Sequence, residues 1–398
     1  MGGIMSSTTT MSSSGAPAEV FLRHVEQFSY RRNRSDRARA LTNVTFFAGA
    51  GFSKAWDSKA PIGCELFTLD TKLIRDVADA GSLARMFGLD ASDRITPETL
   101  RQIVYQLDMY DRFPDVRPRY LDEQNLRMFR GALRAAVLDR YDRATRLNYF
   151  DGAAGRFPLV SPSARQRDIM AFFRHLRLGS VPEDPWEGVR THFITTNYDY
   201  VIETILDNLT PDAPRLFFHT YRGFTPVQIA GGPGFAPVHE HWQVQHLLKI
   251  NGGFEILRRG HGYVLDYGKR DARAIMADLP VVTLASREQD YSDPYFAMVF
   301  PKVVRLMRDS TILVIVGYSL PSDDALIRFF LRQFAEEPED GLGKVIFYLG
   351  PGDAEEKRQT IAEVFPAMER MEAPQLVTYD SGFDQFAQEC LDLLGRRG

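Results

Sequence analysis

The sequence predicts an α/β fold of Rossmann-like type, in which a mostly parallel sheet carries helices on both faces. Short runs of β-branched and aromatic residues recur along the chain, and most are continuous, as expected for strands covered on both faces. Stretches with helical periodicity separate many of these runs, and this alternation is typical of a parallel sheet. The predicted strands are Val44–Ala48, His192–Thr195, Leu247–Ile250, Pro280–Leu284, Thr311–Val316, Val345–Leu349 and Leu376–Tyr379.

The composition is that of a globular protein with a sizeable core. Of 398 residues, 48 are Lys or Arg and 52 are Asp or Glu, which gives a formal net charge of −4, and 44% are hydrophobic. This balance does not favour binding to nucleic acid or to an anionic membrane. No apolar run approaches the ~18 residues that a bilayer crossing needs. Two cysteines exclude a disulfide framework and a four-cysteine zinc site, and they suit a reducing cytoplasm.

The chain divides into a tail, a sheet-bearing domain and an insertion. The gap between the first two predicted strands is far too long for one crossover, and apolar residues recur within it at helical spacing. We therefore expect residues 68–178 to form a helical insertion lobe, and residues 19–67 and 179–398 to form the sheet-bearing domain. Residues 1–18, rich in Ser, Thr and Gly, are expected to be a disordered tail. The arginine cluster Arg31–Arg39 is expected to be a solvated surface, with a docking surface as the alternative.

The first predicted strand runs directly into a glycine loop, Gly49–Ala50–Gly51–Phe52–Ser53. Glycines at the end of a strand let the chain turn tightly and bring backbone N–H groups close to a phosphate. The loop lacks the G-x-G-x-x-G spacing of an ordinary dinucleotide fold, so a plain strand-to-helix turn is the alternative.

Three further polar loops follow predicted strands, and they contain Thr196–Asn197–Tyr198–Asp199, Asn251–Gly252–Gly253 and Gly317–Tyr318–Ser319. In a parallel sheet the carboxyl ends of the strands line the ligand crevice. There Asn197 and Asp199 could hold ribose hydroxyls and a catalytic water. The alternative is an Asn/Asp turn in which Asp199 caps a helix beginning at Val201. Ser319 and the free N–H groups of its loop could hold a ribose or a phosphate.

Together, the four loops in this order resemble the sirtuin-like NAD-binding family, in particular its bacterial branch found in antiphage defence. Gly49–Ser53 resembles that family's Gly-Ala-Gly-x-Ser, Thr195–Asp199 its Thr-Thr/Gln-Asn-x-Asp, and Gly317–Pro321 its late nucleotide-binding loop. The resemblance covers about Thr42 to Phe386, where the insertion matches only in position. It implies that NAD⁺ is bound as substrate or ligand by residues 49–53, Thr196 and residues 317–319.

Two departures from the family pattern limit what this resemblance implies. Deacylating sirtuins hold a zinc with four cysteines, so a chain with two cysteines is expected to use no zinc and to cleave NAD⁺ rather than deacylate proteins. The family's Lys-Leu-His-Gly-Ser pattern carries a His that acts on the ribose, whereas Lys249–Gly253 places Asn251 there. An amide cannot take up a proton near neutral pH, and losing a positioned general base lowers rates by ~10²–10⁴-fold.

Four other histidines lie near these motifs and are candidates for the missing base or for metal ligands. His261 precedes a glycine and would serve only in a shifted register, while His246 is expected to face away from Asn251 on a regular strand. His239 and His241 could bind a metal with His246, but their spacing matches no zinc pattern, so no metal site is expected.

The resemblance thus implies an NAD⁺ glycohydrolase that releases nicotinamide and ADP-ribose, and Asn251 predicts weak or no activity for this chain. Asn197 would orient the ribose or the attacking water, Asp199 would support Asn197 or the nicotinamide amide, and residue 251 would relay the ribose proton. The family implies defence by NAD⁺ depletion, as a homo-oligomer with a separate partner such as a hexameric ATPase, an Argonaute-like protein or a STAND-type sensor. The alternatives are a non-catalytic NAD⁺- or ADP-ribose-binding subunit and, third, a protein deacylase.

Overall fold

The computed structural model describes residues 16–30, 41–70, 74, 94–119, 121–145, 147–178, 188–209, 216–231, 235–236, 244–336, 341, 343–366, 368 and 373–396. The expected tail up to residue 15, the Arg31–Arg39 cluster, His239 and His241 lie outside these described residues.

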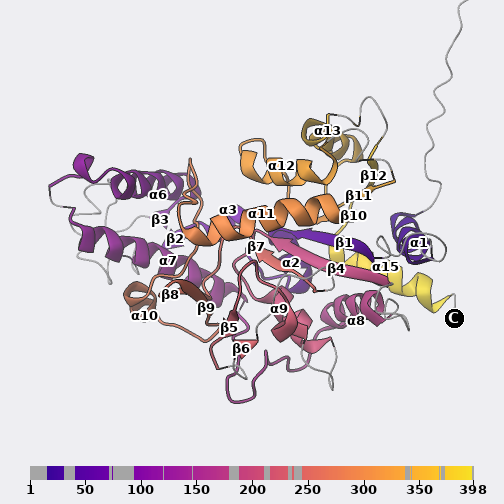
Figure 1. Ribbon diagram of the computed structural model, residues 1–398, viewed down its shortest axis with the longest axis horizontal. Helices are drawn as coiled ribbons and strands as arrows, with labels where there is room; N and C mark the ends of the chain where they lie inside the picture. Colours follow the sequence, from indigo (N-terminus) through magenta and orange to yellow (C-terminus); the bar gives the residue numbers. More distant parts are fainter. Residues whose placement is uncertain are drawn as a thin grey trace, which may run out of the picture.

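A six-stranded sheet in which every neighbouring pair is parallel forms the centre of the molecule, in the order β12–β11–β10–β1–β4–β7 (Figure 1). The strands are β1 (Leu41–Ala48), β4 (Gly188–Thr195), β7 (Leu247–Lys249), β10 (Ser310–Val316), β11 (Val345–Leu349) and β12 (Gln375–Tyr379). From β1 the chain adds β4 and then β7 on one side of the sheet. It then returns to the other side of β1 and adds β10, β11 and β12. This is a doubly wound order, whose ligand crevice lies at the switch between β1 and β10. The predicted α/β fold is confirmed.

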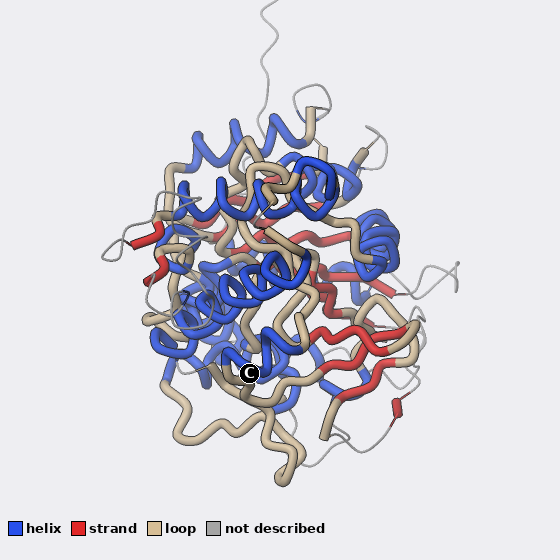
Figure 2. Tube along the Cα trace, turned by 90° about the vertical axis from the view of Figure 1, so that its left-hand side faces the viewer, coloured by secondary structure: helices blue, strands red, loops and turns tan. Residues whose placement is uncertain are grey.

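Helices cover both faces of this sheet, as Figures 1 and 2 show. On one face α2, α8 and α15 pack against one another, α8 also contacts β4, and α1 contacts α15. On the other face α11 lies against β1, β10 and β7, and α12 bridges α11 and α13. Their bounds are α1 (Pro17–Tyr30), α2 (Ala50–Trp56), α8 (Ala164–Leu178), α11 (Pro294–Asp309), α12 (Ala325–Arg332), α13 (Ala354–Val364) and α15 (Phe383–Gly395).

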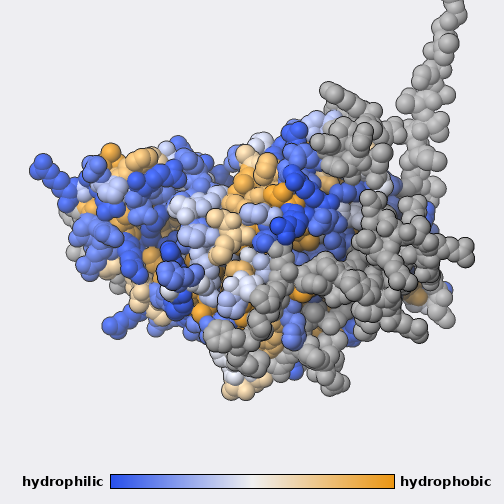
Figure 3. Space-filling view, in the orientation of Figure 1, coloured by the Kyte–Doolittle hydropathy of each residue, from blue (hydrophilic) through white to orange (hydrophobic). Residues whose placement is uncertain are grey.

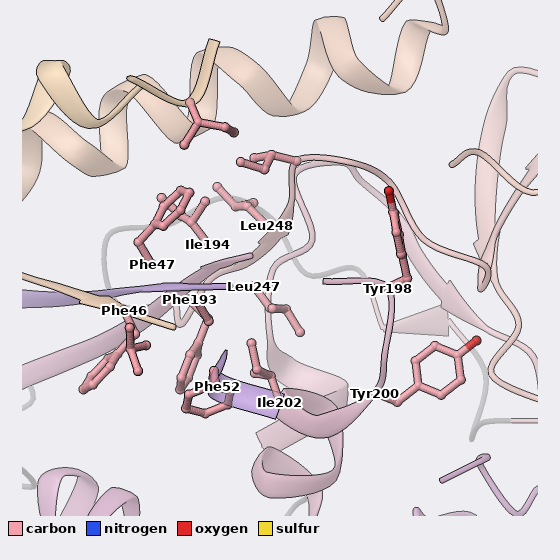
Figure 4. Close-up of a cluster of buried hydrophobic side chains, with 14 of the residues drawn as sticks. Phe46, Phe47, Phe52, Phe193, Ile194, Tyr198, Tyr200, Ile202, Leu247 and Leu248 are labelled. Atoms are coloured by element: carbon pink, nitrogen blue, oxygen red, sulfur yellow. The ribbon is translucent and has the colours of Figure 1, made fainter. Parts of the chain in front are cut away.

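Side chains on both faces of the central strands are apolar, which explains why the strand sequences are continuous rather than alternating. In Figure 4, Phe46 and Phe193 lie on one side of the sheet and Phe47 and Ile194 on the other. All four side chains are fully buried, and the rings of Phe46 and Phe193 stack with centroids 5.7 Å apart. Successive strand residues point to opposite faces, so both faces must be hydrophobic to be covered by helices.

A second group of elements lies beyond the end of the sheet, on the left in Figure 1. Here α6 packs on α7, and α7 packs on α10. The helical spacing of apolar residues between the first two predicted strands, for example at Leu126, Phe129 and Leu133, is confirmed by α7. By contrast α8, although it falls inside the expected insertion 68–178, packs on β4 and α15 of the central domain. The bounds here are α3 (Gly63–Leu66), β2 (Leu69–Asp70), β3 (Arg94–Ile95), α6 (Pro97–Arg112), η2 (Pro114–Val116), α7 (Glu123–Thr145) and α10 (Ala272–Ala277).

A four-stranded sheet in the order β6–β5–β9–β8 adjoins this region. The sequence did not predict it, because its strands are too short for a clear period. Its strands and the remaining helices are β5 (Val227–Ile229), β6 (Phe235–Ala236), β8 (Ile256–Arg259), β9 (Gly262–Leu265), α9 (Val201–Asn208), η3 (Leu216–His219) and η4 (Gln333–Ala335).

The predicted strand Pro280–Leu284 is wrong, because the segment makes only an isolated bridge between Val282 and Gly252. Most of its backbone hydrogen bonds go to a loop: Gly253 N–H donates to the Val281 carbonyl at 2.8 Å, and Thr283 N–H donates to the Asn251 carbonyl at 2.9 Å. The Val281 N–H also donates to the carbonyl of Ile256, the first residue of β8, at 2.8 Å. A run of β-branched residues fits an extended segment beside a loop as well as a strand, so its composition did not distinguish the two.

The surface over α6 and α7 is largely hydrophilic, whereas a more hydrophobic area lies near α12 (Figure 3). Phe329 of α12 is 51% exposed. Within the described parts of the chain, no helix combines the length and the apolar character needed to cross a membrane.

Candidate functional site

The carboxyl ends of four central strands are level with one another. Ala48 of β1 lies beside Val316 of β10 and Thr195 of β4, and Thr195 lies beside Lys249 of β7. The loops that follow these strands therefore begin at one edge of the sheet. The structure brings together the glycine loop, the Asn197 loop, the Asn251 loop and the Gly317 loop, at the switch point of the fold.

The glycine loops of β1 and β10 pack backbone against backbone. Gly51 N–H donates to the Gly317 carbonyl at 2.9 Å, and Gly49 N–H donates to the Val316 carbonyl at 2.9 Å. Gly317 has a φ of +64°, and a Cβ built on it would lie 2.3 Å from the Phe52 nitrogen. These glycines are therefore required by close packing. The N–H groups of Gly49 and Gly51 are used inside the protein, whereas that of Ala50, at the first position of α2, has no intrahelical acceptor.

The late loop is held by contacts on both sides. The Tyr318 hydroxyl donates to Asp324, and its ring meets Phe47 edge-on at 5.4 Å. Burial raises the pKa of Tyr318, so this hydroxyl stays protonated near neutral pH. From α12, the Arg328 guanidinium donates to the carbonyls of Leu320 at 2.8 Å and Pro321 at 3.1 Å. Ser319 lies exposed between these anchors.

A hydrogen-bond chain links the glycine loop to the loop after β4. The Asn197 side-chain amide donates to the Gly49 carbonyl at 2.8 Å and to Ser53 Oγ at 2.9 Å. Ser53 Oγ in turn donates to the Asp199 carboxylate. Both amide hydrogens of Asn197 are thus used, which leaves its Oδ1 to accept a hydrogen bond from a ligand or a water. Ser53 is 2% exposed, so its hydroxyl orients Asn197 and Asp199 rather than facing solvent.

Asp199 also makes the capping contact that the sequence allowed. Its Oδ1 accepts a hydrogen bond from the Val201 N–H at 3.0 Å, at the start of α9. Burial raises the pKa of Asp199, although the hydrogen bonds from Ser53 and Val201 oppose that rise. The carboxylate is therefore a buried anchor for the loop that carries Asn197.

Asn251 reaches the same loop from β7. Its amide nitrogen donates to the Thr196 carbonyl at 3.3 Å. Its Oδ1 is buried and has no hydrogen-bond partner among the described residues. A buried acceptor without a donor costs about 1–3 kcal/mol, so a donor supplied by a ligand would stabilise this arrangement.

Neither His246 nor His261 makes the contacts that Asn251 makes with the loop after β4. His246 Nδ1 lies 3.1 Å from His192 Nδ1, and His192 Nε2 lies 3.1 Å from the Asn43 side-chain oxygen. Burial, with a smaller effect of His246, lowers the pKa of His192 well below its usual value. His261 is exposed in the turn between β8 and β9. Neither His246 nor His261 takes the place of Asn251.

Sequence reasoning missed a buried ion cluster beneath these loops. Lys249 Nζ lies 2.9 Å from Glu203 Oε1 and 2.9 Å from Glu255 Oε1, and it donates to the Asp199 carbonyl at 2.8 Å. All three charged side chains are at most 4% exposed. The signal was a lysine inside the apolar run Leu247–Ile250, because a lysine in a buried strand needs partners.

This cluster also explains why residue 253 is a glycine where the family pattern has a serine. A Cβ on Gly253 would lie 2.2 Å from the Glu255 carboxylate, which Lys249 holds in place. Lys249 and its partners therefore fix the positions of both the Asp199 loop and the Asn251 loop.

Metal-binding groups are not apparent in the described parts of the chain, where no three His, Cys, Asp or Glu side chains gather at one point. Cys390 is buried in α15, and burial raises the pKa of its thiol.

Comparison with known proteins agrees with part of the family resemblance. Solved structures similar to this chain include a Sir2 homologue mutant in complex with 2′-O-acetyl ADP-ribose (11% identity, 88% of this chain and 93% of that chain, TM-score 0.37). They also include Sir2Tm bound to a propionylated peptide (10% identity, 95% of this chain and 98% of that chain, TM-score 0.37). A third is a Sir2 homologue mutant in complex with ADP-ribose (12% identity, 89% of this chain and 93% of that chain, TM-score 0.34). No curated protein matches the sequence. Residues 191–365, from β4 to just past the end of α13, match the SIR2-like domain family.

Proposed function

We propose that this protein is a sirtuin-like NAD⁺ glycohydrolase in which Asn251 stands at the position of the family's catalytic histidine. The observation that carries the proposal is that Asn251, after β7, donates to the carbonyl of Thr196, the residue next to Asn197 in the loop after β4. Both loops begin at the edge of the sheet where the glycine loops of β1 and β10 begin. Each of the two asparagine amides has an oxygen that accepts no hydrogen bond from the described residues. Two such acceptors suit the hydroxyls of a ribose and an attacking water.

The chemistry expected there is hydrolysis of the bond between the ribose and nicotinamide. Nicotinamide leaves with the electron pair of that bond, the anomeric carbon becomes oxocarbenium-like, and water adds to it with release of a proton. Fixed amide oxygens stabilise positive charge that develops on the ribose. Asn197 Oδ1 would orient the water, Asn251 Oδ1 would accept from a ribose hydroxyl, and the Ala50 N–H would face the pyrophosphate.

The neutral amide at 251 limits this reaction. It can hold a ribose hydroxyl but cannot accept its proton, and losing a positioned base lowers rates by ~10²–10⁴-fold. We therefore expect slow turnover or none from the chain as it stands.

The test is nicotinamide release from NAD⁺, measured by chromatography for the full chain and for Asn251→His. The histidine variant is expected to be faster by ~10²–10⁴-fold. Asn125→His, a change at the start of α7 remote from the sheet edge, is the matched control and should change nothing. Adding Asn197→Ala to the histidine variant should abolish its gain. If the histidine variant is folded, binds NAD⁺ and still leaves it intact, glycohydrolase activity is excluded.

A second candidate is a subunit that binds NAD⁺ or ADP-ribose without cleaving it and acts through a partner. The observation that favours it is Asn251 itself, which keeps a ligand acceptor while removing the base. Calorimetry separates the two functions: this candidate requires binding of NAD⁺ or ADP-ribose by the unchanged chain, and it fails if neither ligand binds.

The biological part of the proposal rests on the family resemblance. It comprises NAD⁺ depletion in antiphage defence, in the cytoplasm, as a homo-oligomer with a separate partner. Light scattering of the purified chain tests the oligomer, and NAD⁺ levels in phage-infected cells that carry or lack the gene test the role in defence.

A further inference from the structure

The loop after β10 has a backbone conformation that its own sequence does not favour. Leu320 has a φ of +52°, in the left-handed region that a leucine rarely adopts. Its side chain is buried, so the strain lies in a segment that is packed into the protein. Strained residues persist only where the surrounding contacts over-determine them, and they gather at ligand sites. Contacts from outside the loop must therefore hold Leu320 in this conformation.

Arg328 of α12 supplies these contacts. Its Nη2 donates to the Leu320 carbonyl at 2.8 Å, and its Nε donates to the Pro321 carbonyl at 3.1 Å. The two carbonyls are consecutive, so the planar guanidinium fixes the orientation of two successive peptide groups. The Pro321 carbonyl also accepts from the Asp324 N–H at 3.2 Å, at the start of α12. Contact at two points restricts rotation of the loop more than a single hydrogen bond would.

The guanidinium is itself held by α13, which packs on α12 (Figure 1). Its Nη1 donates to the Glu363 carboxylate at 2.7 Å. The Arg328 side chain is 18% exposed, whereas that of Glu363 is 60% exposed. Each of the three guanidinium nitrogens thus donates to the protein. Arg328 is therefore better placed to fix the loop than to bind a ligand itself.

We propose that Arg328 is a positioning residue for nucleotide binding: it holds the loop Gly317–Ser319 in the conformation that receives the ADP-ribose part of NAD⁺. Leu320 directly follows Ser319, so a rotation of its peptide group would move Ser319. A loop that is fixed before the ligand arrives loses less conformational freedom on binding, and the ligand is held more tightly. This role rests on the proposed function, because it requires a nucleotide at residues 317–319.

Isothermal titration calorimetry of the full chain with ADP-ribose tests this role. Arg328→Gln should weaken binding by about tenfold or more, because two hydrogen bonds from a charged group are lost. Arg328→Lys should bind with intermediate affinity, because an ammonium keeps the charge but lacks the planar fork. The matched control is Arg332→Gln, which changes an exposed arginine one turn further along α12 and should leave the affinity unchanged.

A kinetic measurement in the Asn251→His variant separates positioning from a general loss of structure. The loop binds a part of NAD⁺ that is remote from the bond that breaks. Adding Arg328→Gln should therefore raise KM for NAD⁺ by about tenfold and leave kcat unchanged, as expected when binding is lost equally from substrate and transition state. A merely structural defect would instead reduce the amount of folded enzyme, which lowers the apparent kcat and leaves KM unchanged.

The outcomes distinguish failure of this role from failure of the proposed function. If the unaltered chain binds ADP-ribose and both Arg328 variants bind it equally well, the positioning role is wrong and the proposed function stands. If the unaltered chain binds neither ADP-ribose nor NAD⁺, both are wrong. If Arg328→Gln does not fold, the milder Arg328→Lys decides: weaker binding supports the role, and unchanged binding overturns it.

Discussion

The two halves of the candidate site are built in opposite ways. On β1 and β10, Gly49, Gly51 and Gly317 pack backbone against backbone, and the loops approach closely because side chains are missing. On β4 and β7, Asn197 and Asp199 are held by side-chain hydrogen bonds above the buried charge of Lys249. Defects in the first half should be steric and independent of pH, whereas defects in the second should be electrostatic and depend on pH.

The largest effect on stability is expected at the charged half, from Lys249→Met. The substitution leaves the Glu203 and Glu255 carboxyls buried together without their cation. Removing one partner of a buried ion pair typically costs about 3–5 kcal/mol. The free energy of unfolding, measured by urea denaturation, should fall by that order near neutral pH. It should fall by less in acid, because burial raises the pKa of the Glu255 carboxyl, which loses its charge there.

Lys269→Met is the matched control for that variant. Lys269 is 69% exposed and pairs with Asp142 at 2.8 Å, so its loss should change stability by less than about 1 kcal/mol. Equal losses of stability in the two variants would show that the loops after β4 and β7 do not depend on the buried cluster of Lys249. The proposed difference between the two halves of the site would then be wrong.

A smaller loss is expected at the glycine half, from Gly317→Ala. The added Cβ would lie 2.3 Å from the Phe52 nitrogen and 2.4 Å from Gly51 Cα, in a backbone with φ of +64°. The left-handed backbone alone costs about 1–2 kcal/mol, and overpacking adds about 1–3 kcal/mol. Urea denaturation at two pH values should show the same loss at both, because no titrating group is changed.

Gly343→Ala separates the two contributions to that loss. Gly343 has a φ of +78°, but a Cβ there would meet nothing within 4 Å. Its loss should therefore be limited to the backbone contribution. Equal losses at residues 317 and 343 would show that the two glycine loops can move apart without penalty.

The smallest effect is the pH dependence contributed by Asp199. Burial raises the pKa of this carboxyl in the folded state, so the folded chain binds the proton more readily than the unfolded chain. Its contribution to stability is present below the unfolded pKa and is lost as the pH rises through the folded pKa. Asp199→Asn should therefore reduce the loss of stability that follows as the pH rises above about 4, the usual pKa of an Asp carboxyl, measured as the difference between variant and parent. An unchanged pH profile would mean that Asp199 titrates normally.

Much of the fold could be predicted because its signals are local. The strand at 311–316 is apolar from Ile312 to Val316 and is followed by Gly317, so the sequence predicted it. The segment 280–284 was misassigned because its composition fits an extended chain beside a loop as well as a strand. The partners of Lys249 could not be anticipated, because Glu203 lies on α9, remote from β7 in the sequence.

The sequence by itself determined that an α/β sheet exists and that polar loops follow its strands, since hydrophobic period and strand-ending glycines are properties of neighbouring residues. It also determined that residue 251 carries an amide without a basic nitrogen. Only the tertiary structure decided that Ser53 links Asn197 to Asp199 and that Lys249 pairs with two buried glutamates. The physical reason is that hydrogen bonds and ion pairs depend on distances between residues remote in the chain, which only folding fixes.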